Sequence, residues 1–132
     1  MQDCSVTITT SADGRETTMK REGSCQLSVV GCMLQYREEN AAVRILLNGE
    51  AAEVERMGDY TLRLYLKRGE TTIGYLGIGG SEGEIGVVTH KVAYSIGKDS
   101  LLLALQYDLL MNGETQKMKL RIYARMNKGE QA

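Results

Sequence analysis

The chain has 132 residues and a formal net charge of −1, and a chain of this length buries roughly two-thirds of its unfolded surface. A nearly balanced charge provides no strong field to attract nucleic acid or anionic lipid, so neither partner is expected. No apolar run approaches the ~20 residues that span a bilayer, and the opening residues lack the basic start and apolar run of a signal peptide. We therefore expect a single cytoplasmic domain over residues 1–132 that does not associate with membranes.

Turn signals divide the chain into about ten segments of strand length. Asn-Gly and Asp-Gly pairs are the strongest signals, because a type I′ hairpin needs positive φ at both central residues. They occur at Asp13-Gly14, Asn48-Gly49 and Asn112-Gly113. Weaker turns or breaks are expected at Val30-Gly31, Gly58-Asp59, Arg68-Gly69, Gly79–Gly83 and Lys98-Asp99.

Alternating apolar residues on both sides of the first turns predict antiparallel pairs that share one apolar face. The expected partners are Ile8 with Met19, Val6 with Arg21, Val43 with Val54, Arg44 with Glu53, Ile45 with Ala52, Leu62 with Tyr75, Leu64 with Ile73, and Lys67 with Glu70.

The stretch "SLLLALQYDLLMNG" contains good helix formers, but its register favours a strand. With Asn112-Gly113 at the turn, every second residue on each side is apolar, and the opposite face pairs polar residues. The apolar pairs are Tyr107 with Met118, Leu105 with Leu120, Leu103 with Ile122, and Leu101 with Ala124; the polar pairs are Asp108 with Lys117 and Gln106 with Lys119. A turn at Lys98-Asp99 adds Ile96 with Leu101, Tyr94 with Leu103, Val92 with Leu105, His90 with Tyr107, and Val88 with Leu109.

Sequential antiparallel strands leave unpaired edges unless the sheet closes. The prediction is therefore an all-β fold, a single antiparallel up-and-down β-barrel of about ten strands. A twisted sheet packed on itself is the structural alternative.

The stretch "GEIGVVTHKVAYSIGKDSLLLALQYDLLMNGE", with Thr89-His90-Lys91 and Tyr107-Asp108, resembles the YwiB-like family of uncharacterised bacterial proteins. "REGS" at Arg21–Ser24 and the Asp13-Gly14 hairpin extend the resemblance over nearly the whole chain. The resemblance implies a small calycin-type, lipocalin-like barrel and no particular activity. The chain departs from the family pattern at Gly80-Ser81, where members often have an aromatic residue and a glycine, and His90 stands where the usual basic residue follows Thr.

The predicted register places His90, Tyr94, Tyr107 and Arg21 on the inner face, where each polar group needs a partner. Either His90 and Tyr107 satisfy each other, or the four residues orient a small, partly apolar ligand inside the barrel. The alternative function is a non-catalytic interaction module with a filled barrel. An enzyme using His90 and Tyr107 is less favoured, because no GxSxG or HExxH motif and no second histidine is present.

No cofactor or metal is expected. A lone inward histidine could hold haem, but nothing else in the chain indicates it. Three cysteines with one histidine do not make a four-ligand zinc site, so Cys4, Cys25 and Cys32 are interpreted as core residues. The stripe of Lys117, Lys119, Arg121 and Arg125 around Tyr123 has the composition of a nucleic-acid platform, but is interpreted as a solvated strand face.

Overall fold

The computed structural model describes residues 1–28 and 31–127. They form ten strands in a closed antiparallel barrel in which each strand pairs with its neighbours in sequence and β1 pairs with β10. The predicted all-β, up-and-down barrel is confirmed. The strands are β1 (Gln2–Ala12), β2 (Arg15–Ser28), β3 (Gly31–Glu38), β4 (Ala41–Asn48), β5 (Ala51–Gly58), β6 (Tyr60–Lys67), β7 (Thr71–Ile78), β8 (Ser81–Ile96), β9 (Ser100–Met111) and β10 (Glu114–Met126).

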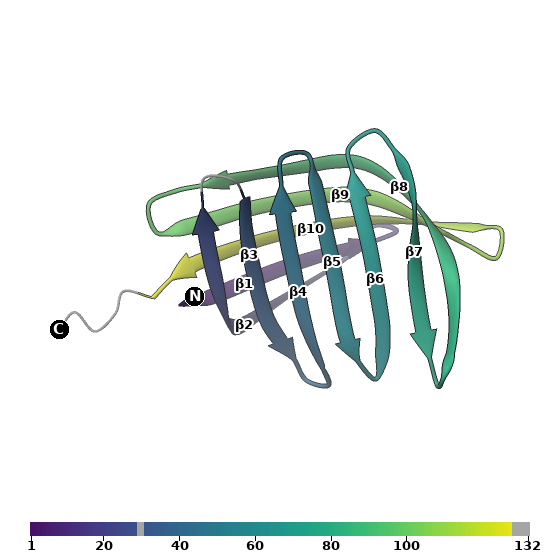
Figure 1. Cartoon of the computed structure of the whole chain (residues 1–132), viewed down its shortest axis with the longest axis horizontal. Helices are drawn as coiled ribbons and strands as arrows, with labels where there is room; N and C mark the ends of the chain where they lie inside the picture. The colour runs from purple at the N-terminus through teal and green to yellow at the C-terminus, as the bar shows by residue number, and fades with distance from the viewer. Residues whose placement is uncertain (29–30, 128–132) are drawn as a thin grey trace.

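The barrel is flattened into two layers that cross each other (Figure 1). The front layer contains β3 to β7, and the back layer contains β1, β9 and β10. The long strands β2 and β8 belong to both layers, because each pairs with a back strand along one part and with a front strand along the other. Among the described residues, no helix is long and apolar enough to cross a membrane.

Each of these two strands has a local feature where it passes between the layers. In β2 the feature is Gly23, where a Cβ atom would lie 2.2 Å from the carbonyl oxygen of Gln35, so only glycine fits. In β8 it is a β-bulge between Thr89 and Lys91. The β6–β7 turn docks on this bulge, since Gly69 N–H donates to the Thr89 carbonyl and Thr89 N–H donates to the Glu70 carbonyl.

Side chains from both layers fill the centre of the barrel. Leu34 and Ile45 of the front layer are fully buried, as are Leu101, Leu105 and Ile122 of the back layer. These residues alternate with exposed ones along their strands, which is the pattern that the sequence predicts for one inner and one outer face.

The predicted registers of two hairpins are confirmed. Around Asp13-Gly14 and Asn112-Gly113 every predicted partner is found, and Asp13 and Asn112 have positive φ. The Val30-Gly31 break falls partly on Val30, which lies outside the described residues.

Two other registers differ from the prediction. The β4–β5 turn centres on Gly49 and Glu50, so Ile45 faces Val54 and Arg44 faces Glu55. This shift of two residues preserves the faces. The β6–β7 hairpin keeps the predicted Lys67–Glu70 contact at its turn, but farther along its register slips by one, so Leu62 faces Leu76.

The slip in β7 reverses the predicted faces of that strand. Gly74 lies on the inner face and Ile73 is 56% exposed on the outer face. A Cβ at Gly74 would lie 2.7 Å from the carbonyl oxygen of Arg63, so the close approach of β6 and β7 selects glycine on the inner side.

The predicted inner position of His90 is wrong, and the bulge is the reason. From Ile96 back to Val92 the β8–β9 register is as predicted, but the extra residue shifts the rest by one, so Thr89 faces Tyr107 and Val87 faces Leu109. His90 therefore points outward. Its side chain is 51% exposed, and its Nε2 atom lies 3.0 Å from Asp108 Oδ2.

The bulge places a hydroxyl group in the core. Thr89 is 1% exposed, and its Oγ1 atom has no hydrogen-bond partner among the described residues. A buried hydroxyl without a partner costs about 1–3 kcal/mol, so Thr89→Val should raise the free energy of unfolding by about 1 kcal/mol. Urea unfolding would measure the change, with the exposed Thr115→Val as the matched control. A clear loss of stability in Thr89→Val alone would show that the hydroxyl is satisfied, by a buried water for example.

Candidate functional site

The structure places two of the four predicted site residues, Tyr107 and Arg21, on the inner face toward the same end of the barrel. Tyr107 is buried, and Arg21 is half-buried opposite Val6. Tyr94 is at the other end, where its hydroxyl oxygen accepts a hydrogen bond from Gly49 N–H at 3.1 Å. His90 lies outside the barrel. The predicted set is therefore divided among three places.

Two further tyrosines lie near Tyr107. Burial raises the pKa of Tyr107 to about 12, and Tyr60 adds to the rise. Burial also raises the pKa of Tyr36 well above its ordinary value, as do the Glu38 carboxylate and Tyr107, while Arg21 opposes the rise. Tyr36, Tyr60 and Tyr107 form what we call the tyrosine cluster. Neither Tyr36 nor Tyr107 has a hydrogen bond from its hydroxyl within the described part of the chain.

Sequence reasoning missed Tyr36 and Tyr60, although one signal was available. Leu34, Tyr36 and Glu38 alternate on the inner side of β3, and the same period-two rule that selected Tyr107 would have selected Tyr36. Tyr60 follows the predicted break at Gly58-Asp59, and the alternation of inward and outward residues in the preceding strand does not continue across this break.

Arg21 has the properties expected of a cation that binds an anionic ligand. Its guanidinium donates to the Lys20 carbonyl oxygen at 2.9 Å and contacts the Met19 sulfur at 3.4 Å. It forms no ion pair within residues 1–28 and 31–127. A guanidinium has five N–H donors arranged for planar oxyanions, so most of the hydrogen-bonding capacity of Arg21 is unused by protein groups.

Arg56 is an inward arginine of the opposite kind, because two carboxylates neutralise it and each of its three nitrogens donates to a protein group. Its side chain is 13% exposed and bonds Glu38 at 3.2 Å and Asp59 at 2.8 Å. It also donates to the Tyr60 carbonyl oxygen at 2.9 Å and stacks 3.7 Å above the centre of the Tyr60 ring. The Arg56 guanidinium lowers the pKa of Asp59. This network fixes the rim of the barrel beside the tyrosine cluster.

An apolar hollow of about 350 Å³ opens on the same rim, between the β7–β8 turn and the β9–β10 turn. Inward Leu76, Ile85 and Met111 line it. Leu76 faces Leu62, and Leu62 faces Arg56. A row of inward side chains therefore connects the hollow to Arg56 and its partners. Met118, half-buried, lies directly opposite Tyr107.

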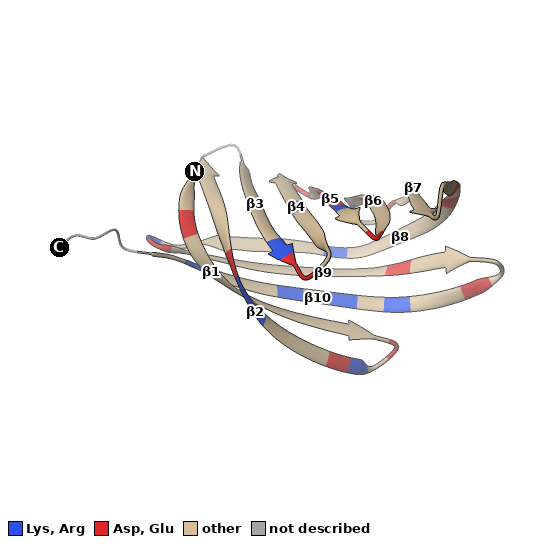
Figure 2. Ribbon diagram, turned by 90° about the horizontal axis from the view of Figure 1, so that it is seen from below, with Lys and Arg blue, Asp and Glu red and all other residues tan. Residues whose placement is uncertain are grey.

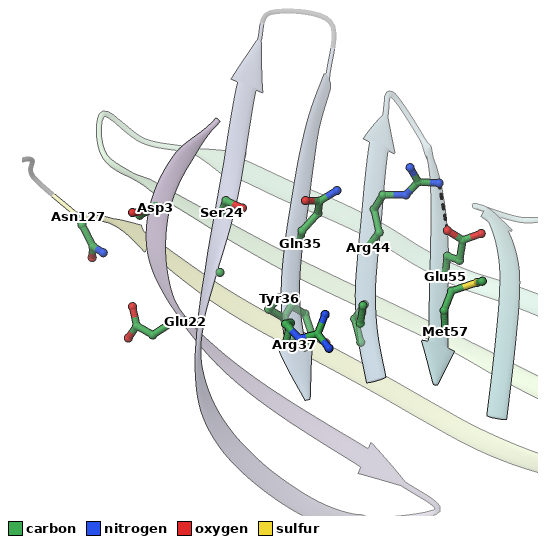
Figure 3. A pocket seen from close by; sticks show the side chains of 13 residues that line it. Asp3, Glu22, Ser24, Gln35, Tyr36, Arg37, Arg44, Glu55, Met57 and Asn127 are labelled. Carbon is green, nitrogen blue, oxygen red and sulfur yellow. Dashed lines mark hydrogen bonds and ion pairs between the residues drawn. The ribbon is translucent and has the colours of Figure 1, made fainter. Parts of the chain in front are cut away.

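A hollow of about 660 Å³ lies on the outside of the front layer (Figure 3). Outward side chains of β2 to β5 line it, among them Ser24, Gln35 and Arg44. Arg44 is already neutralised by Glu55 at 3.1 Å. The two cations that line this outer groove, Arg37 and Arg44, are exposed and Arg44 is paired, so the groove offers a weaker basis for a specific ligand than the tyrosine cluster.

The cysteines behave as core residues, as the sequence indicates. Cys4, Cys25 and Cys32 are buried free thiols, and burial raises the pKa of each to about 11. A thiol of that pKa has very little nucleophilic thiolate at neutral pH. The described residues contain no group of three or more His, Cys, Asp or Glu side chains placed to hold a metal ion.

The contrast between two arginines on neighbouring strands gives a stability prediction. Arg56→Met leaves Glu38 and Asp59 without their cation, and the loss of charge-assisted hydrogen bonds should lower the free energy of unfolding by about 2 kcal/mol. Arg63→Met removes a 56% exposed arginine that lies 3.5 Å from Glu55, and should cost less than about 0.5 kcal/mol. Equal effects in urea unfolding would contradict the structural role of Arg56.

The raised pKa of Tyr107 gives a pH prediction. The unfolded chain loses the phenolic proton near pH 10 and the folded chain near pH 12, so the unfolded state is favoured as the pH rises through this window. Tyr107→Phe should therefore lose less stability than wild type between about pH 10 and pH 12. Tyr123→Phe, which changes an exposed ring, should retain the wild-type slope. Unfolding free energies measured across this range would test the difference, and parallel curves for all three proteins would contradict it.

Comparisons with known proteins agree with the fold. The crystal structure of the ywiB protein from Bacillus subtilis superposes with a TM-score of 0.82 and 14% sequence identity, covering 96% of this chain and 93% of that one. A search of curated proteins gives no match. Residues 4–122 match a family described as "Domain of unknown function (DUF1934)". The chain therefore belongs to this family, whose YwiB-like barrel it shares.

Proposed function

We propose that the protein binds a small, partly apolar molecule carrying an acidic group, at the end of the barrel that holds the tyrosine cluster. This proposal rests mainly on Arg21, an inward, half-buried cation with no carboxylate partner within the described residues. It keeps the interior ligand that the sequence suggests, but moves its polar contacts from His90 and Tyr94 to Arg21, Tyr36 and Tyr107.

The energetic basis is the strength of hydrogen bonds that involve a partly desolvated cation. A carboxylate at Arg21 would form charge-assisted hydrogen bonds, which are shorter and about twice as strong as those between neutral groups. The hydroxyls of Tyr36 and Tyr107 are protonated at neutral pH, since even an ordinary phenol titrates near pH 10. Both can therefore donate to the same acidic group.

The apolar part of the ligand would contact the half-buried Met118 and Leu62 and extend into the hollow lined by Leu76 and Met111. A volume near 350 Å³ is within the range of small-molecule sites. Because Leu34, Ile45 and Leu105 fill the centre of the barrel, the ligand must remain at the end.

The filled centre also supports a second candidate function, the interaction module for which the barrel is only a scaffold. In that case no ligand would enter at the tyrosine cluster, and Arg21 would be a solvated rim residue. The three free thiols support our inference that the protein works in the reducing cytoplasm under either function.

Arg21→Gln, which removes the cation but keeps a polar side chain, is the decisive variant. We expect it to weaken binding of the anionic apolar dye anilinonaphthalene sulfonate at least about tenfold, the effect of about 1.4 kcal/mol. Fluorescence titration would measure the affinity, and decanoate, an apolar carboxylate, should displace the dye from wild type.

Arg15→Gln is the matched control, because Arg15 is an exposed arginine on the same strand. It should bind the dye as wild type does. If wild type binds neither compound, or if both variants bind equally well, the ligand proposal is wrong and the interaction module is favoured. Circular dichroism of both variants would verify that the barrel is folded.

A further inference from the structure

The outer face of the back layer carries more cations than carboxylates, although Asp3, Glu16, Glu22 and Asp108 also lie on it. Along β10 the buried residues Leu120, Ile122 and Ala124 alternate with exposed ones that point outward. Figure 2 shows Lys and Arg segments following one another along this strand. We define the basic face as the exposed cations of β10 with their neighbours on β2 and β8: Lys20, Lys91, Lys117, Lys119, Arg121 and Arg125.

The cations of the two layers differ in their partners, except that Arg37 on β3 of the front layer has no ion pair among the described residues. Every cation of β4 to β7 and their turns is in an ion pair with a carboxylate, the pairs being Arg44–Glu55, Arg56–Glu38, Arg56–Asp59, Arg63–Glu55, Lys67–Glu70 and Arg68–Glu50. No cation of the basic face has an ion pair among the described residues. Asp108, the carboxylate opposite Lys117, is bonded to His90 instead.

The register brings three of these cations around one shallow hollow of about 320 Å³. Lys91 and Lys119 lie on the two sides of Gln106, and Arg121 lies between Thr9 and Ala104. Strands are ~4.8 Å apart and alternate residues ~7 Å apart, so the cations are close enough to repel one another in the free protein. The hollow also contains the hydroxyls of Thr9 and Ser11, and Glu16 is its one acidic residue.

An aromatic ring lies in the same stripe. Tyr123 is 41% exposed, points outward between Arg121 and Arg125, and is directly opposite the exposed Leu102. A tyrosine face beside a row of cations is the combination with which single-stranded nucleic acid is bound, because bases stack on the ring and phosphates contact the cations. The partner of Tyr123 on β1, Thr7, is small and leaves that side of the ring accessible.

We propose that the basic face binds single-stranded nucleic acid, with phosphates at Lys91, Lys119 and Arg121 and a base on Tyr123. The nearly balanced net charge of −1 argues against such a partner only if charge is evenly spread. It is not, because nine of the 17 acidic residues lie between Glu38 and Glu84, in the front layer and its turns. This site is outside the barrel and does not depend on the ligand proposed for the tyrosine cluster.

The charge-reversed variant Lys119→Glu/Arg121→Glu tests the proposal. Fluorescence anisotropy with a labelled single-stranded oligothymidine should show that wild type binds and that its affinity falls as salt is raised. The double variant should bind at least about tenfold more weakly and with a shallower salt dependence. Tyr123→Leu, which keeps every charge, should weaken binding by about fivefold or more through lost stacking.

Arg63→Glu/Arg68→Glu is the matched control, because it changes the net charge equally on the front layer. It should bind within about twofold of wild type, as should Arg21→Gln, which separates this site from the tyrosine cluster. Equal losses in both double variants would overturn the proposal, since the effect would then be one of total charge. Absence of binding, or binding to phosphatidylglycerol vesicles but not to the oligonucleotide, would also overturn it.

Discussion

The architecture depends on two strands that belong to both layers. A barrel of ten strands with a filled centre must be flattened, and a flattened barrel must turn a corner wherever a strand passes from one layer to the other. In β2 the corner coincides with Gly23, where the carbonyl of Gln35 leaves no room for a side chain. In β8 it coincides with the bulge at Thr89–Lys91, which the β6–β7 turn covers. Closure through β1 and β10 then removes the last free edges of the sheet.

Both proposed sites follow from this geometry. The inner tyrosine cluster combines Tyr107 of the back layer with Tyr36 and Tyr60 of the front layer, which approach each other only because the layers pack face to face. The basic face lies on the outer side of the back-layer strands, opposite the side that faces the core. Alternation that buries Leu120 and Ile122 presents Lys119 and Arg121 to solvent in one row. One face of β10 thus contributes to the core, and its other face carries the exposed cations Lys117, Lys119, Arg121 and Arg125.

Most of the fold could be predicted from the sequence, because hairpin registers are local. Around Asn112-Gly113 and Asp13-Gly14, turn chemistry and alternation indicate the same pairs. Prediction failed at His90 because a contact outside the hairpin accompanies the bulge, which is bonded to Gly69 and Glu70 of the β6–β7 turn. It failed at Ile73 because alternation favoured placing this apolar residue inside, whereas the close approach of the Arg63 carbonyl selects Gly74 on the inner side. The period-two rule includes neither contact.

The candidate sites, like the fold, were predicted only where the local pattern of the strands determines them. Arg21 and Tyr107 were predicted on the inner face because each lies in a regular hairpin, with β1 and with β10 respectively. The network of Arg56 required knowledge of which turns meet at the rim. The separation of charge between the layers also depends on the fold, since a net charge sums over residues that the barrel places on opposite sides.

The pairing of the first and last strands has a consequence for the connectivity of the chain. Cys4 lies opposite Met126, and Asn127 N–H donates to the Asp3 carbonyl oxygen at 2.9 Å, so the two ends of the described barrel lie side by side. A short linker could join them, and new termini could be opened at an exposed turn such as Asn48–Ala51. Such a circular permutant would keep every strand pair while changing the order in which the strands leave the ribosome. The order in which the strands are synthesised can thus be changed without changing their order around the barrel.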